Sequence, residues 1–117
     1  MTQEEMKLRT KQFALRIIRL VQSLPPDLVA SVLGKQLLRS GTSVGANYRA
    51  SCRAKSTADF INKLSIVEEE ADEAIYWMEL IVELDYIRAK RLHDLIDEAN
   101  AILALIVASI KTSRRRR

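Results

Sequence analysis

Residues that break helices or build covalent and metal-based sites are scarce in this chain. Its 117 residues include three glycines, two prolines, one cysteine and one histidine. A single cysteine excludes an intrachain disulfide and a cysteine zinc cluster, and a single histidine excludes a histidine-rich metal site. We therefore expect no metal, no cofactor and no catalytic residues. The scarcity of glycine and proline favours an all-α fold.

Long apolar runs are also missing. Residues 1–11 are polar and charged where a signal peptide would be apolar, and the most apolar run, residues 101–110, is too short to span a bilayer. We expect a cytoplasmic protein with no membrane partner.

The charges are segregated along the chain. Residues 1–55 carry ten Lys and Arg against three acids, a net charge of +7, and residues 59–85 carry nine acids against one lysine, a net charge of −8. Residues 114–117 are four arginines, a basic tail that we expect to be disordered. This segregation indicates either ion pairs between neighbouring helices or a basic surface for a polyanion.

Hydrophobic periodicity predicts four helices in one domain, residues 1–113. Pro25 and Pro26 stop the first helix, and Asp27 is the expected N-cap of the second. Ser56, with an acid three residues later, starts the third. Three short connections between long helices predict an antiparallel, up-down-up-down four-helix bundle. The expected helices span residues 3–23, 28–55, 57–85 and 89–112.

The second helix holds all three glycines. Read as a loop, this segment would use Gly41 and Gly45 as hinges and cradle a phosphate, but the spacing of a P-loop is missing. Read as a helix, it places its apolar residues on one face, and the two glycines let a neighbouring helix approach closely. We favour the helix, with Asn47 expected at that helix interface.

The opposite side of this helix gathers cations along about 27 Å. We predict that they contact the phosphates of a nucleic-acid backbone, because no aromatic side chains lie between them for base recognition. In the alternative, acids of the third helix neutralise them. The predicted nucleic-acid-binding residues are Lys35, Arg39, Arg49 and Arg53.

The third helix carries two apolar stripes, whereas a helix on the outside of a monomer needs only one. The expected core stripe is Phe60, Leu64, Val67, Ala71, Ile75, Met78 and Val82. The second stripe predicts an oligomer interface made by Ile66, Trp77, Leu80 and Leu84. Stacking of bases on Tyr76 and Trp77 is the less favoured interpretation. No histidine accompanies the carboxylates of Glu69, Glu70 and Glu73, which favours a solvated or salt-bridged face over a metal site.

Several motifs follow one another in a specific order. They are QLLRSGTSVGANYR (residues 36–49), DFINKLSIV (59–67), EEADE (69–73) and YW (76–77). In this combination the chain resembles a bacterial family of four-helix-bundle proteins, the 23S rRNA intervening-sequence proteins, over nearly its whole length. Many relatives carry an acid after the Asn-Tyr-Arg positions, where this chain has Ala50.

The resemblance implies a homopentameric ring and a role in nucleic-acid binding. The related accessory variability determinant of diversity-generating retroelements works with a reverse transcriptase and its RNA, so the implied partners are further copies of the chain, RNA or DNA, and a reverse transcriptase. We expect a non-enzymatic, oligomeric nucleic-acid-binding accessory protein. The alternative is a structural or protein-interaction scaffold whose charges are paired internally.

Overall fold

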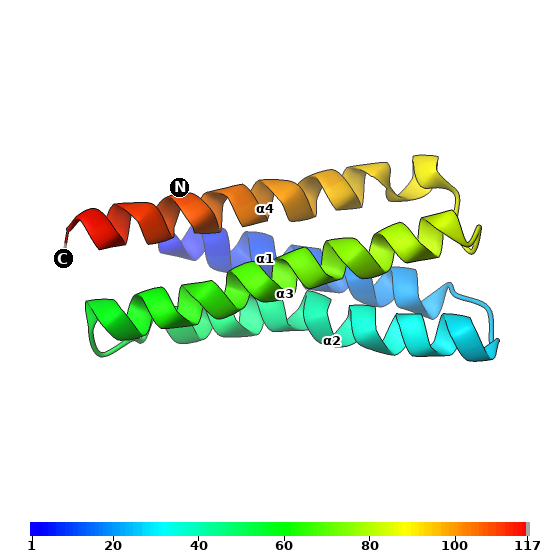
Figure 1. Cartoon of the computed structure of the whole chain (residues 1–117), viewed down its shortest axis with the longest axis horizontal. Helices are drawn as coiled ribbons and strands as arrows, with labels where there is room; N and C mark the ends of the chain where they lie inside the picture. Colours follow the sequence, from blue (N-terminus) through cyan, green and yellow to red (C-terminus); the bar gives the residue numbers. More distant parts are fainter. Residues whose placement is uncertain (117) are drawn as a thin grey trace.

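The computed structural model describes residues 1–116 and is a bundle of four α-helices (Figure 1). Successive helices run in opposite directions, and each packs against the next one along the chain, whereas α1 meets α4 over a much shorter stretch. The bundle measures 48 × 22 × 20 Å. This arrangement confirms the predicted all-α four-helix bundle. The helices are α1 (Gln3–Gln22), α2 (Leu28–Ser51), α3 (Thr57–Glu83) and α4 (Ala89–Arg115).

Polar caps fix the starts of the first three helices. Thr2 Oγ1 accepts a hydrogen bond from the backbone N–H of Glu5, whose carboxylate accepts one from the backbone N–H of Thr2, both at 3.1 Å. Asp27 and Ser56 cap α2 and α3 by accepting from the backbone N–H three residues later, at 3.1 and 3.0 Å. Each bond satisfies a donor that has no partner within its helix. The starts predicted at Asp27 and Ser56 are confirmed.

Helix ends differ from the prediction, most of all for α2 and α4. α2 ends at Ser51, not near residue 55, because residues 52–54 form tight turns that reverse the chain before the extended Ser56 cap. α4 continues to Arg115, so Arg114 and Arg115 are helical where a disordered tail was expected. Arg117 lies outside the described residues. α3 stops before Asp85, which has a φ of 63° in the left-handed region that Asp tolerates better than most residues.

One apolar cluster runs through the bundle and includes residues of all four helices. On α3 the predicted core face is displaced, since Phe60, Ile75 and Val82 are only partly buried. α3 packs against both α2 and α4, so its most buried face points between these two neighbours. The buried positions of α3 are Ile61, Leu64, Val67, Ala71, Ala74, Met78 and Ile81. No described helix is long and apolar enough to cross a membrane.

The glycines of α2 allow α1 to approach closely. A Cβ atom placed on Gly41 would lie 2.8 Å from two side-chain carbons of Ile17, which is fully buried. A Cβ atom on Gly45 would lie 3.3 Å from the backbone oxygen of Thr10. Helix backbone cannot give way as a side chain can, so larger residues would push the helices apart. The predicted role of Gly41 and Gly45 is confirmed.

Candidate nucleic-acid interface

Arg39, the second of the four predicted phosphate-binding residues, is held by two acids of α3. Its Nη1 donates to Glu70 Oε2 at 2.9 Å, and its Nη2 donates to Glu73 Oε1. The hydrogen bond to Glu73 raises the pKa of the guanidinium. For Arg39, therefore, the structure has the internal pairing that the sequence left open as the alternative.

The same network reaches Trp77. Its indole Nε1 donates to Glu73 Oε1 at 3.1 Å, and this bond, together with the one from Arg39, lowers the pKa of Glu73. Glu73 thus stays ionised and ties α2 to α3. Glu70 and Glu73, the carboxylates considered for a metal, hold a guanidinium instead.

Lys35 and Arg49 lie on α2 together with Arg39, whereas Arg53 lies beyond the end of this helix. Lys35, Arg49 and Arg53 are exposed, and within residues 1–116 none of them makes an ion pair. Lys35 is separated from Arg49 by about 21 Å of helix. Arg53 lies in the turn after α2, because the helix ends at Ser51. The predicted extension of α2 to Arg53 is therefore wrong, and phosphate contacts at the four cations stay predictions.

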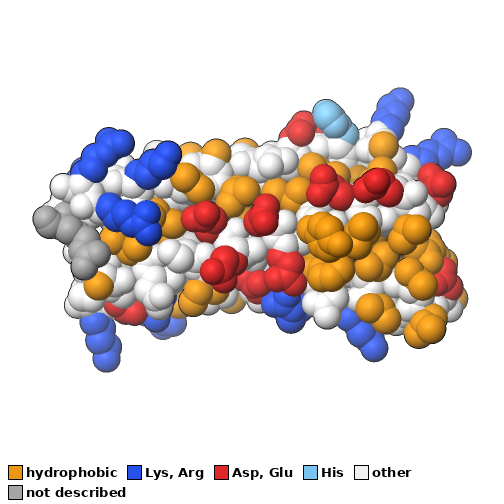
Figure 2. Space-filling model, in the orientation of Figure 1, with side chains coloured by type: hydrophobic (Ala, Val, Ile, Leu, Met, Phe, Trp, Pro, Cys, Tyr) orange, Lys and Arg blue, Asp and Glu red, His pale blue; other side chains and the backbone are white. Residues whose placement is uncertain are grey.

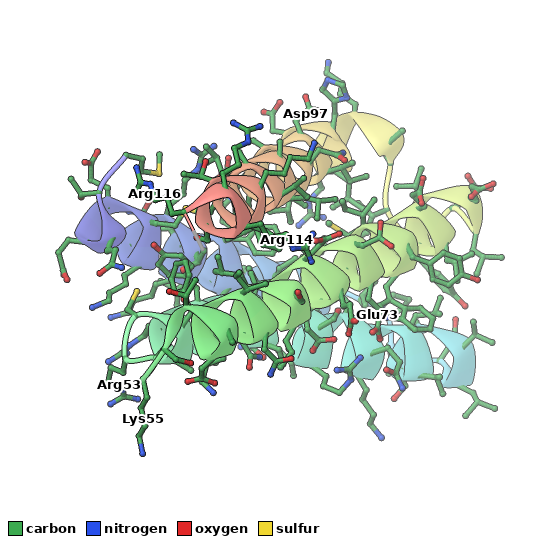
Figure 3. All side chains as sticks on the ribbon, turned by 60° about the vertical axis from the view of Figure 1, so that its left-hand side comes forward. Arg53, Lys55, Glu73, Asp97, Arg114 and Arg116 are labelled. Carbon is green, nitrogen blue, oxygen red and sulfur yellow. The ribbon has the colours of Figure 1, made fainter. Side chains whose placement is uncertain are left out.

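The fold brings together a different set of cations. α2 and α4 both finish at the end of the bundle where α1 begins, as the antiparallel topology requires (Figures 1 and 3). Figure 2 shows Lys and Arg side chains gathered over this end. Lys55 and Arg116 line one hollow here, of about 430 Å³. We call this surface the basic end and define it by exposed Arg49, Arg53, Lys55, Arg114 and Arg116.

The sequence did not show that the terminal arginines lie at the same end of the bundle as Arg53 and Lys55. The predicted topology implies this arrangement, because in an up-down-up-down bundle the second and fourth helices finish at the same end. On the face shown in Figure 2, acidic side chains gather over the middle of the bundle, where they appear in red.

The structure also shows what Asn47 and a cluster of titratable side chains on α4 contact. The amide of Asn47 donates to the backbone oxygen of Ser43, at 2.9 Å, so it bonds within its own helix and not across the interface as predicted. His93, Asp94 and Asp97 lie close together on α4, but all three are exposed, and His93 Nε2 lies 3.1 Å from Asp97 Oδ2. This is an ordinary pair one helical turn apart.

The predicted oligomer interface faces outward on α3. Ile66 and Leu84 are 37% and 53% exposed, whereas Trp77 and Leu80 are partly buried. The structure adds residues of α2, since Leu28 and Val32 are also exposed. Figure 2 shows apolar side chains gathered at the end of the bundle where α3 finishes and α2 starts, opposite the basic end.

Comparison with known proteins identifies the family. A sequence model of the 23S rRNA-intervening sequence protein family matches residues 3–108. The chain belongs to this family. A crystal structure from Bacteroides thetaiotaomicron VPI-5482, described as a protein with unknown function from the S23 ribosomal protein family, is 40% identical with a TM-score of 0.88. The match covers 95% of this chain and 99% of that one. No curated protein matches the chain.

Membership of the 23S rRNA-intervening sequence protein family agrees with the resemblance found in the sequence motifs. The structure shows what two of those motifs contact. The Ser-Gly-Thr-Ser-Val-Gly segment, residues 40–45, packs α2 against α1, and the Glu-Glu-Ala-Asp-Glu segment, residues 69–73, supplies the acids that bind Arg39.

Proposed function

We propose that this member of the 23S rRNA-intervening sequence protein family is a non-enzymatic nucleic-acid-binding protein that contacts phosphates and acts as a homo-oligomer. The observation that carries the proposal is the basic end, where α2, the turn after it and α4 present exposed cations together. Cations in an ion pair have already lost much of their attraction for a phosphate. Arg39 is paired, whereas Arg49 makes no ion pair within residues 1–116, so we propose Arg49 and not Arg39 as a binding residue.

Binding of this kind has a physical signature. Cations that neutralise phosphates release counterions, so affinity falls steeply as salt rises and depends little on base sequence. Several copies of the basic end on one oligomer would bind a long strand with avidity. The exposed apolar surface on α2 and α3 supports self-association, with a ring of five copies as the proposed assembly, because apolar patches of this kind mark interaction sites.

A protein-interaction scaffold is the second candidate, and the pairing of Arg39 with Glu70 and Glu73 favours it. If every cation were paired in the assembled protein, no polyanion would bind. Whether Arg49 and Arg53 bind a nucleic acid therefore distinguishes the two candidate functions.

The test compares these arginines directly. Fluorescence anisotropy would measure the binding of labelled RNA and DNA strands of different sequence over salt concentrations from about 50 to about 200 mM. We expect binding that weakens steeply with salt, and an Arg49→Gln/Arg53→Gln variant that binds less tightly than the parent. Arg39→Gln is the matched control and should keep most of the affinity. Absence of binding by the parent at low salt, or a larger loss in Arg39→Gln, would favour the scaffold.

A further inference from the structure

A groove of about 520 Å³ lies between α1 and α2. Its lining includes Ala14 from α1, and Gly45 and Ala46 from α2. Because these side chains are small or absent, the surface is hollowed where the two helices meet. The volume lies within the range of pockets that hold small ligands.

Three cations and one acid line the groove. Lys7 and Lys11 come from α1, one helical turn apart, and Arg49 comes from α2. Lys7 lies 3.1 Å from Glu4, one turn earlier on the same helix, and this exposed pair is weak. Lys11 and Arg49 are exposed and, within residues 1–116, make no ion pair. A cleft with an excess of one sign of charge, here three cations against Glu4, attracts counterions of the other sign.

We infer that this groove binds the phosphodiester backbone of a nucleic-acid strand, with its phosphates between the two lysines of α1 and Arg49 of α2. This inference rests on the proposed function and adds where on the protein the strand binds. Arg49 belongs both to the groove and to the basic end, so a strand in the groove continues toward Arg53 and Lys55. No aromatic ring lines the groove, so bases are not stacked there and recognition is through the backbone.

The floor of the groove explains why a backbone fits. At Gly45 α1 and α2 are close enough that an added Cβ would lie 3.2 Å from Thr10 Oγ1. Ala46, beside it, is exposed and adds only a methyl group. A phosphate in the groove can therefore contact cations of both walls at once. On a flat surface with the same charges it could not.

The decisive experiment uses two triple variants of the full chain. Lys7→Gln/Lys11→Gln/Arg49→Gln removes the groove cations, and Arg88→Gln/Lys90→Gln/Arg91→Gln removes three exposed cations at the opposite end of the bundle. Both variants lose the same charge. Anisotropy with a labelled single strand of roughly 20 nucleotides measures their affinities, and circular dichroism checks that both are folded.

We expect the groove variant to lose about tenfold or more in affinity at low salt, and its salt slope to flatten by about two, since three phosphate contacts are lost. The control variant should stay close to the parent. A second pair tests the same groove by adding an acid. Ala46→Glu should weaken binding strongly, while Ala104→Glu, at an exposed position of α4, should weaken it little.

The outcomes separate the two proposals. If the parent binds and the two triple variants lose equal affinity, the groove is not the site, although the proposed function stands. If the parent does not bind at low salt, both proposals fail. If polyglutamate displaces the strand from the parent as well as unlabelled strand does, the groove is a site for acidic protein segments and the inference is overturned.

Discussion

Arg9 of α1 and Glu98 of α4 form a two-point ion pair. The guanidinium Nε donates to Oε2 of the carboxylate at 2.8 Å, and Nη2 donates to Oε1 at 2.7 Å. The side chains are only 29% and 22% exposed. This pair joins α1 to α4, which meet over a much shorter stretch than helices that follow one another along the chain. Its planar, two-bond geometry is the strong form of a salt bridge.

Breaking this pair should weaken the fold at neutral pH. The hydrogen bonds from Arg9 lower the pKa of Glu98 in the folded protein, so its stabilisation is present above the ordinary glutamate value and is lost as the pH falls through the folded value. We expect Glu98→Gln to reduce the free energy of unfolding by about 1 to 2 kcal/mol at neutral pH and by much less near about pH 3. Urea unfolding at both pH values measures this. Glu79→Gln, at an exposed position, is the control, and an equal effect of both variants would show that the pair contributes nothing.

The glycines of α2 should respond differently to the same substitution. Gly41→Ala places a methyl group 2.8 Å from buried Ile17, so overpacking should outweigh the gain in helix propensity and cost about 1 kcal/mol or more. Gly34→Ala contacts Leu24 Cδ1 at 3.1 Å, the end of a flexible side chain that can move. Its stability should stay the same or rise by up to about 1 kcal/mol. Thermal or urea unfolding compares the two, and equal effects would contradict the close helix contact.

Self-association should depend on the exposed apolar residues of α3. Light scattering of the parent is expected to give a mass several times that of the 13.3 kDa chain. An Ile66→Ser/Leu84→Ser variant should have a lower mass, because it removes apolar area that water would otherwise contact. Leu8→Ser/Leu15→Ser, at exposed positions of α1, is the control and should assemble as the parent does. A monomeric parent at micromolar concentration would refute the interface.

The sequence predicted well what depends on local chemistry. Asp27 and Ser56 mark helix starts because capping involves residues three positions apart, and Gly41 and Gly45 marked a close helix contact because no other residue is as small. The sequence did not decide whether Arg39 is free or paired, because its pairing with Glu70 and Glu73 depends on the register between α2 and α3. The position of Arg53 was missed because the turn before Ser56 shortened α2.

The buried face of α3 differs from the predicted one because it also depends on the neighbouring helices. Periodicity identifies apolar stripes, but which stripe is buried depends on the direction of the neighbouring helices. Ile61, Ala74 and Ile81 are buried because α2 and α4 flank α3 on two sides. The groove between α1 and α2 also arises from two helices together, so neither segment alone predicts it.

Nucleic acid is proposed to bind at the basic end and in the groove beside it, and lysine acetylation tests this placement most directly. Full-length protein would be acetylated with and without a bound strand at low salt, and mass spectrometry would give the rate at each lysine. We predict that the strand slows modification of Lys7, Lys11 and Lys55 and leaves Lys90, at the opposite end of the bundle, unchanged. Equal protection of all four lysines, or protection of Lys90 alone, would contradict the account.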